Sequence, residues 1–209
     1  MWVLLSTWIV GDEGIELGEG DRWMTVLEVS LDGAEAVDSH SPLRFELVGD
    51  PLSVAGPSYD IVARVQSNET SGSFLDAGEV TLTPSALVQW PSGTVLAFKS
   101  ELQGGWYPFI PPPKHLIVDG EVRQLFIREW DAVSDGAPDN YCPDPESLRV
   151  RSIRRMETWE ISGRLDGPDK VISDYLLELT SATGGLPQSA GIEARNEISK
   201  IPSFVANSG

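Results

Sequence analysis

The sequence predicts an all-β fold, mainly antiparallel, arranged as a β-barrel or β-sandwich of about ten strands with at most one or two short helices. Apolar and polar residues alternate over residues 43–47, 59–65 and 159–165, as expected where successive side chains of a strand point to opposite faces of a sheet. Fifteen prolines and twenty glycines in 209 residues fit turns between short strands and fit long helices poorly.

The N-terminal run Trp2–Val10 is apolar and predicts a buried first strand. A signal peptide would need a basic segment before this run and a small-residue cleavage site after it, whereas Asp12 and Glu13 follow almost at once. A membrane-spanning helix needs about 20 apolar residues. Neither this run nor any later one is that long, so we expect no membrane span.

Turn chemistry separates the next predicted strands. Gly18–Asp21 leads into an apolar strand at 23–29. Asp119-Gly120 predicts a type I′ hairpin between 115–118 and 121–127, because both central positions of that turn need a positive φ. Pro91–Gly93 predicts a second hairpin, between strands at 86–90 and 94–98.

Two C-terminal segments are harder to assign. Residues 171–179 fit either a strand or a helix with one apolar face, and we favour a strand because a clear strand and a tight loop precede them. Residues 188–199 predict a short helix, and residues 200–209 a tail.

Three segments predict loops, at 48–57, 103–113 and 132–147. The last is long, acidic and rich in proline, which makes it a candidate domain boundary or lid. We expect a single β domain over residues 1–209. The alternative is a subdivision into an acidic β unit (1–131), the loop (132–147), a C-terminal β unit with a short helix (148–199) and the tail (200–209).

The net charge of −17 is distributed unevenly along the chain. Residues 1–146 contain 7 of the 15 lysines and arginines and 24 of the 32 acidic residues, whereas residues 147–209 contain eight of each. Repulsion from phosphate makes nucleic acid and anionic membranes unfavourable partners. Two explanations of the acidic part remain: a basic protein partner, or docking on the basic C-terminal strands of the same chain.

The single cysteine, Cys142, excludes an internal disulfide and a metal site made of cysteines alone. So little cysteine predicts a reducing, cytoplasmic location, and we expect a prokaryotic one. No histidine lies near Cys142 in the sequence to activate it, so we interpret it as a thiol without a function.

Two clusters are candidate binding sites. Trp106, Tyr107 and Phe109 lie on a loop stiffened by prolines, where rigid aromatic rings either anchor a partner or fold back over the core. Arg149 and Arg151 belong to the one basic cluster, together with Arg154 and Arg155. Such arginines either hold a carboxylate or phosphate, or pair with acidic strands of the same protein.

A catalytic or metal site has weaker support. His115 would need Glu101 or Glu129 as a partner for acid–base chemistry, so an enzyme would use His115, Glu129 and Tyr107. His40 and His115 are too few for a three-histidine zinc site. The spacing of the acidic residues in the 132–147 loop (Asp135, Asp139, Asp144 and Glu146) does not match a calcium-binding loop. We therefore expect no metal and no cofactor.

The composition and motifs favour a non-catalytic binding protein that engages a basic protein partner through an acidic surface, in the manner of immunity proteins or inhibitors. Nucleotide-binding, nucleophile-elbow and zinc-protease motifs do not occur in the sequence. The alternative is a small β-barrel enzyme or carrier for a hydrophobic small molecule, held in a cavity lined by aromatic residues. An open, aromatic interior would favour the alternative, and a filled interior with an acidic face would favour the binding protein.

Overall fold

The computed structural model describes residues 1–68, 72–105, 113–134, 141–156 and 170–181. Thirteen strands, most of them paired antiparallel, join in one hydrogen-bonded network, which confirms the predicted all-β class. The described residues contain one α-helix, α1 (Thr7–Glu13), and two single-turn 3₁₀ helices, η1 (Lys114–Leu116) and η2 (Pro145–Ser147). No helix in the described ranges has the length and apolar character that crossing a membrane requires.

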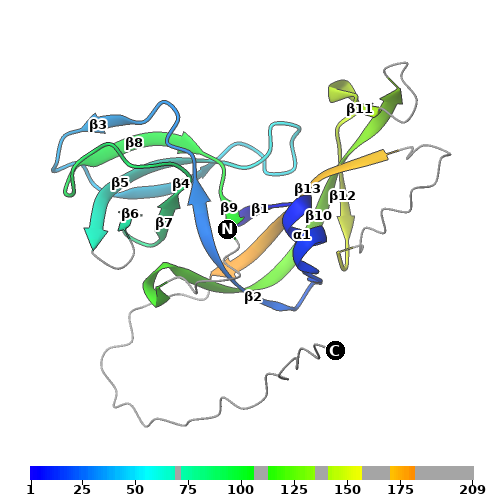
Figure 1. The fold of residues 1–209 in the computed structure, drawn as a ribbon, viewed down its shortest axis with the longest axis horizontal. Helices are drawn as coiled ribbons and strands as arrows, with labels where there is room; N and C mark the ends of the chain where they lie inside the picture. The colour runs from blue at the N-terminus through cyan, green and yellow to red at the C-terminus, as the bar shows by residue number, and fades with distance from the viewer. Residues whose placement is uncertain (69–71, 106–112, 135–140, 157–169, 182–209) are drawn as a thin grey trace, which may run out of the picture.

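Five strands form a closed ring, visible in the lower and right-hand parts of Figure 1. They are β1 (Trp2–Ser6), β2 (Arg22–Val29), β9 (Gln103–Gly105), β10 (Ile117–Ser134) and β13 (Lys170–Ser181). Around the ring, β10 pairs with β13, β13 with β1, β1 with β9, β9 with β2, and β2 with the start of β10. This closure is the barrel-like element of the fold.

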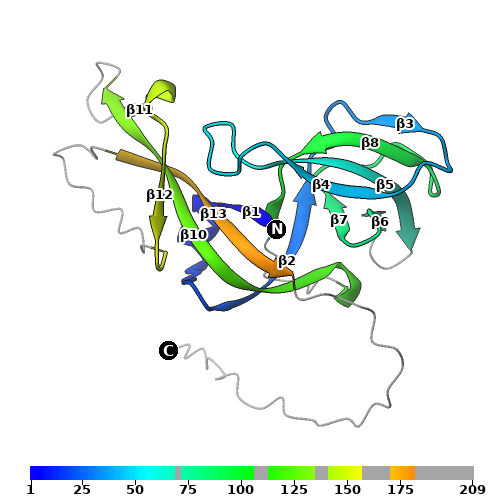
Figure 2. The ribbon, with the colours of Figure 1, turned by 180° about the vertical axis from the view of Figure 1, so that it is seen from behind.

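Six further strands form what we call the outer lobe, on the left of Figure 1 and on the right in the reverse view of Figure 2. These strands are β3 (Glu35–Val37), β4 (Arg44–Val48), β5 (Ser58–Asn68), β6 (Gly72–Asp76), β7 (Thr81–Pro84) and β8 (Val95–Ser100). One edge of β5 pairs with β4 and then β6, and the other with β8. The lobe continues into the ring because β7 pairs with β2.

The 18-residue strand β10 organises the ring. At Gly120 it pairs with Trp23 of β2 on one edge and with Ser181 of β13 on the other. The predicted hairpin at Asp119-Gly120 is wrong, because β10 continues through both residues without a turn. A Cβ at Gly120 would lie 2.8 Å from the Thr180 carbonyl oxygen. The glycine is therefore needed for close strand approach and not for a turn.

Beyond Gly120, β10 pairs with β12 (Arg149–Ile153) and then with β11 (Tyr141–Pro143). The segment 132–147, predicted as a loop, thus contains the end of β10, the strand β11 and the turn η2. The short-range composition of this segment resembles a loop, but pairing with a neighbouring strand makes part of it extended.

One hydrophobic core extends through both the ring and the outer lobe. Leu5 and Leu125 of the ring and Ile61, Leu75 and Leu96 of the lobe belong to the same buried cluster. Tyr59 also joins the two parts, because its hydroxyl accepts a hydrogen bond from the Trp2 amide (2.6 Å) and donates one to the Trp2 carbonyl (3.1 Å).

Several strand predictions are confirmed. The run 23–29 lies in β2, and 171–179 lies in β13, so that segment is a strand and not a helix. Tyr59, Ile61, Ala63 and Val65 of β5 are all buried, as their alternation predicted. The loop at 48–57 is also confirmed, since β4 ends at residue 48 and β5 begins at residue 58.

Three other predictions are wrong in part. The first strand ends at Ser6, and α1 follows it, because an apolar run by itself does not separate helix from strand. The hairpin around Pro91–Gly93 lacks its first strand, since β5 and β3 already occupy both edges of β8 and leave none for 86–90. The loop at 103–113 begins with strand β9.

The remaining predictions lie outside the described residues. They are the strand at 159–165, the helix at 188–199 and the tail at 200–209.

Candidate functional site

The outward face of the outer lobe carries charged side chains from several neighbouring strands. Lys99 of β8 lies opposite Asp60 of β5, and Glu46 of β4 lies opposite Asp60 on its other side. Glu35 of β3 lies opposite Ala97 of β8. The alternation of the strands turns Ile61 and Phe98 inward and leaves these charged residues on the solvent side.

Two adjoining cavities hollow this part of the molecule, with volumes of about 210 and 380 Å³. They share Asp32 and Lys99 in their linings, and we call them together the acidic groove. The charged side chains of the groove are five carboxylates and two cations: Glu28, Asp32, Glu35, Asp60 and Glu101, with Arg44 and Lys99.

The cations of the groove neutralise only part of this negative charge. Lys99 Nζ lies 3.5 Å from Asp60 Oδ1, and the two side chains are 72% and 28% exposed. Asp32 and Glu35 are exposed and form no ion pair with any residue in the described ranges. An excess of negative charge therefore faces solvent along the groove.

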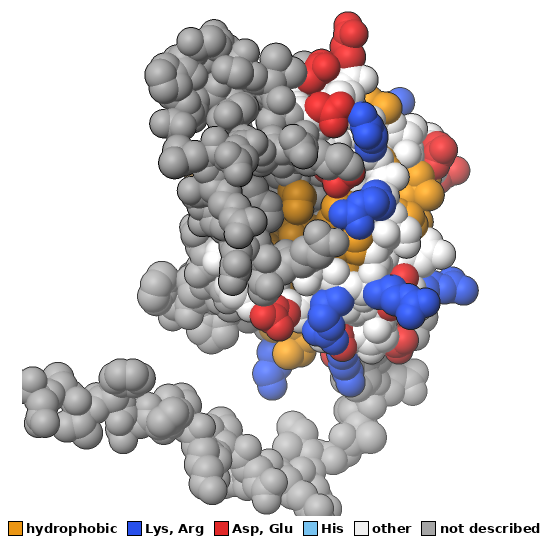
Figure 3. All heavy atoms as spheres, turned by 90° about the vertical axis from the view of Figure 1, so that its right-hand side faces the viewer, with side chains coloured by type: hydrophobic (Ala, Val, Ile, Leu, Met, Phe, Trp, Pro, Cys, Tyr) orange, Lys and Arg blue, Asp and Glu red, His pale blue; other side chains and the backbone are white. Residues whose placement is uncertain are grey.

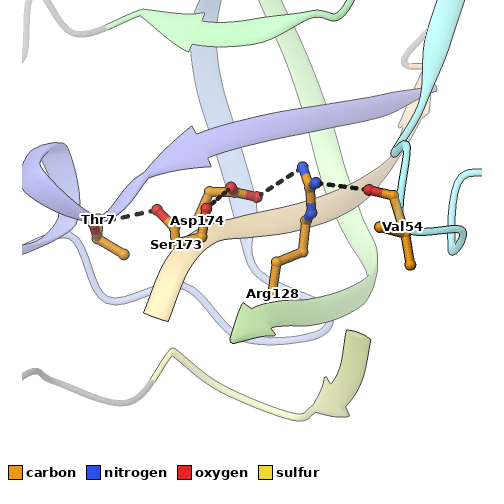
Figure 4. Close-up of polar contacts among 5 residues, drawn as sticks. All are labelled: Thr7, Val54, Arg128, Ser173 and Asp174. Atoms are coloured by element: carbon orange, nitrogen blue, oxygen red, sulfur yellow. Dashed lines mark hydrogen bonds and ion pairs between the residues drawn. The ribbon is translucent and has the colours of Figure 1, made fainter. Parts of the chain in front are cut away.

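Glu101 connects the groove to a second polar site, which we call the junction cluster: Glu101, Arg128, Ser173 and Asp174. Figure 4 shows the guanidinium of Arg128, from β10, between Asp174 of β13 on one side and the loop residue Val54 on the other. Arg128 Nη1 lies 3.4 Å from Asp174 Oδ1, and Nη2 donates to the Val54 carbonyl at 3.1 Å. The side chains of Arg128 and Asp174 are only 11% and 17% exposed.

Hydrogen bonds fix the rest of the junction cluster. Ser173 Oγ donates to Asp174 Oδ2 at 2.5 Å, and Thr7 Oγ1 donates to the Ser173 carbonyl at 3.4 Å (Figure 4). Gly56, with φ +75°, brings the loop backbone over the guanidinium, so that a Cβ there would lie 3.3 Å from Arg128 Nη1 and 3.5 Å from Glu101 Oε1. The cluster thus joins the outer lobe to the ring.

Burial perturbs both carboxyl groups of the junction cluster. Loss of solvation raises the pKa of Asp174, against the hydrogen bond from Ser173 and the charge of Arg128. Loss of solvation also raises the pKa of Glu101, where Arg128 opposes the effect and Asp174 adds to it. One guanidinium is therefore the compensating positive charge for two carboxyl groups. Burial favours the neutral form of both.

The arginines predicted as a binding site lie beside acidic residues of the same chain. Arg149 Nη2 lies 2.8 Å from Asp131 Oδ2, Arg151 Nη2 lies 3.7 Å from Glu129 Oε2, and Arg155 pairs with Asp21 at 3.4 Å. Figure 3 views the molecule from the β12 side and shows lysine and arginine side chains gathered there among acidic ones. This geometry supports intramolecular pairing of the basic cluster.

Of the candidate catalytic residues, the structure describes His115 and Glu129 and places them far apart along the chain. His115 is exposed in η1, with its ring 5.1 Å from the ring of Phe74. Glu129 is 5% exposed and lies beside Arg151 near the other end of β10. Glu129 lies twelve positions after Ile117 along that strand, which is roughly 40 Å of extended chain.

The other sequence candidates divide into described and undescribed residues. Trp106, Tyr107, Phe109, Asp135 and Asp139 lie outside the described residues. Cys142 lies in β11, opposite Val133. His40 is an exposed turn residue whose backbone amide donates to Asp38 Oδ1. Within the described ranges, no three or more histidine, cysteine or acidic side chains are grouped to hold a metal ion.

Sequence reasoning missed the junction cluster, apart from naming Glu101 as a partner for His115. Arg128 and Asp174 are 46 residues apart and meet only because β10 pairs with β13. The available signal was an arginine directly after the apolar residues 125–127, since a charged residue needs a partner when the strand that carries it is buried.

Comparison of this chain with protein-family models, with curated proteins and with solved structures found no match.

Proposed function

We propose that this protein is a non-catalytic binding protein that engages a basic protein partner through the acidic groove. One observation carries the proposal: five carboxylates and only two cations line a solvent-open groove that runs over the outer lobe and the adjoining end of β2. A negative groove raises the local concentration of a positively charged partner and orients its approach. It also disfavours nucleic acid and anionic membranes, which carry the same sign of charge.

The packing of the ring supports binding at the surface over enclosure of a ligand. Apolar side chains from β1, β2, β10 and β13 fill the core, among them Leu5, Leu27, Leu125 and Leu177. Trp23 packs against β9, where a Cβ at Gly104 would come within 2.3 Å of its ring. The alternative function, an enzyme or carrier with an aromatic cavity, gains no comparable support from the described residues.

Arg149 and Arg151 are not the main contacts in this proposal, because neighbouring carboxylates already attract them. Trp106, Tyr107 and Phe109 remain proposed anchors for the partner. We also keep a prokaryotic cytoplasm as the proposed location.

The test is the affinity of the full chain for a fluorescent oligolysine peptide, measured by anisotropy. The double variant Asp32→Asn/Glu35→Gln removes two groove carboxylates, and we expect it to weaken binding about tenfold at low salt. The control Glu19→Gln/Glu79→Gln changes the net charge equally, at exposed carboxylates that do not line the groove, and is expected to weaken binding by about twofold at most.

Salt provides the second arm of this test. Binding of the wild-type chain should fall steeply between about 0.05 and 0.5 M NaCl, because the Debye length shortens over that range. An equal loss of peptide affinity in the groove variant and in the control variant would show that the attraction depends on net charge alone. That result would reject the groove as the binding site. Binding that does not change with salt would reject the electrostatic mechanism altogether.

A further inference from the structure

Strand β3 forms an open edge of the outer lobe. It pairs with β8 on one side, and no other described strand pairs with it. Figures 1 and 2 both show β3 at the rim of the lobe with no described strand beyond it. No described residue hydrogen-bonds to the outward edge of Glu35–Val37, and all three residues are exposed. Such an edge presents unpaired backbone groups that can template another strand.

The charges around this edge distinguish it from the other open edge of the lobe. Asp32, Glu35 and Asp38 lie on or beside β3, all exposed and without an ion pair in the described ranges. Arg44 and Lys99 line the groove together with Asp32 and Glu35, but Lys99 already pairs with Asp60. Arg64 donates to the Ser39 and Gly93 carbonyls. Strand β4, which pairs only with β5, carries Arg44 beside Glu46 and is balanced in charge.

From this combination we infer that the edge of β3 accepts an extended basic segment of the partner as an added strand. The inference rests on the proposed function and specifies how the partner would occupy one side of the acidic groove. Backbone hydrogen bonds to β3 would supply affinity, and side chains on alternate positions would supply specificity.

The register of β3 defines the chemistry of that segment. Glu35 and Val37 lie opposite Ala97 and Val95 of β8 and share one face of β3, and Glu35 and Ala97 line the groove. An added strand would lie about 4.8 Å from β3, with its side chains within contact distance of those directly opposite. The segment therefore carries a lysine or arginine opposite Glu35 and an apolar residue opposite Val37, two positions away.

A second copy of this chain does not fit the same edge. Pairing two β3 strands would bring Asp32, Glu35 and Asp38 of one copy near the same carboxylates of the other, and repulsion between these like charges opposes the pairing. The same side chains that attract a basic segment thus protect the edge from self-association.

The experiment compares two labelled peptides on the full chain by fluorescence anisotropy. The first alternates lysine and valine at every second position, with threonines between them. The second has the same side chains, but every backbone amide is N-methylated, so its charge is kept and its backbone N–H donors are lost. We expect the N-methylated peptide to bind at least about tenfold more weakly.

Matched protein variants locate the contact. Glu35→Lys on β3 should weaken the first peptide at least about tenfold, whereas Glu79→Lys should change binding by about twofold at most. Glu79 is exposed between β6 and β7, and its reversal alters the net charge equally. Circular dichroism checks that both variants fold. If Glu35→Lys does not fold, Glu35→Gln replaces it, with an intermediate loss of peptide affinity expected.

Each outcome decides a different point. Equal binding of both peptides would overturn strand addition and leave the acidic groove as the binding surface. No binding of either peptide at low salt would overturn the proposed function and this inference together. Dimers of the full chain that the first peptide disperses, measured by sedimentation, would assign the edge to a second copy and also overturn the inference.

Discussion

The charge of Arg128 acts on both Glu101 and Asp174. For the pKa of each carboxyl group, the effect of burial is larger than the effect of this attraction. Loss of solvation is the largest influence on both carboxyl groups and raises the pKa of each. A carboxyl group with a raised pKa in the folded state stabilises the fold below its ordinary pKa, and this contribution is lost as the pH rises through the folded value. At neutral pH the ionised Glu101 therefore opposes folding.

The first prediction concerns Glu101→Gln. Glutamine does not ionise, so the variant should have a higher melting temperature than the wild type at about pH 7. The difference should shrink as the pH falls toward 4.5, the ordinary pKa of this group, because the wild-type carboxyl then becomes protonated. Thermal unfolding followed by circular dichroism across this range measures the effect.

The control for this prediction is Glu79→Gln, which removes an exposed carboxylate outside the junction cluster and should have little effect on the melting temperature. A lower melting temperature for Glu101→Gln at neutral pH would mean that the attraction of Arg128 outweighs burial, contrary to our interpretation.

At the scale of the elements, the hydroxyl group of Tyr59 links β5 of the outer lobe to β1 of the ring by hydrogen bonds. Tyr59 is 2% exposed, and its hydroxyl satisfies both the amide and the carbonyl of Trp2. Its ring stacks on Phe45 with centroids 4.6 Å apart, so replacement by phenylalanine preserves the packing and removes only the polar contact. Burial raises the pKa of Tyr59 to about 12.

The second prediction is that Tyr59→Phe lowers the free energy of unfolding by about 1–3 kcal/mol, the cost of leaving buried backbone groups unpaired. Urea denaturation at neutral pH measures it, with an unchanged slope showing that both states keep their compactness. A loss below about 0.5 kcal/mol would mean that water replaces the hydroxyl.

The pH dependence of the same variant provides an independent check. The wild-type hydroxyl has a folded pKa of about 12, above its ordinary value of 10.0. The stability that this hydroxyl contributes to the fold is complete below pH 10 and is lost as the pH rises toward 12. The reason is that the same hydroxyl ionises more readily in the unfolded chain than in the folded one. Tyr59→Phe should lack this part of the alkaline loss, and phenolate absorbance should show one fewer tyrosine with a delayed titration.

At the scale of the whole molecule, the ring and the outer lobe depend on a common core. Buried residues of β1, β5, β8, β10 and β13 belong to one cluster, and β2 pairs with strands of both parts. Neither part can therefore lose its packing without exposing apolar surface of the other.

The third prediction is that the full chain unfolds in a single cooperative transition. Calorimetry should give equal calorimetric and van't Hoff enthalpies, and tryptophan fluorescence should follow the same curve as far-ultraviolet circular dichroism. Two separate transitions would show that the ring and the outer lobe are independent units, as in the subdivided arrangement that the charge distribution also allowed.

The alternation of apolar and polar residues predicted the strands that have one buried face and one exposed face. In β5, for example, the buried side chains are those of Tyr59, Ile61, Ala63 and Val65. It was less successful where a strand's role depends on its neighbours. The hairpins at Gly120 and Gly93 were wrong because pairing at both edges of β10 and β8 depends on strands distant in the sequence. Turn propensity contains no information about those edges.

The sequence by itself determined the all-β class, the inward faces of the clearest strands and the excess of acidic residues in 1–146, because these follow from residue type and from a period of two. Only the tertiary structure decided which strands close the ring, that Arg128 meets Asp174, and that Asp32, Glu35 and Asp60 line one groove. These contacts join residues far apart along the chain, and packing of the common core selects among the pairings that local preference allows.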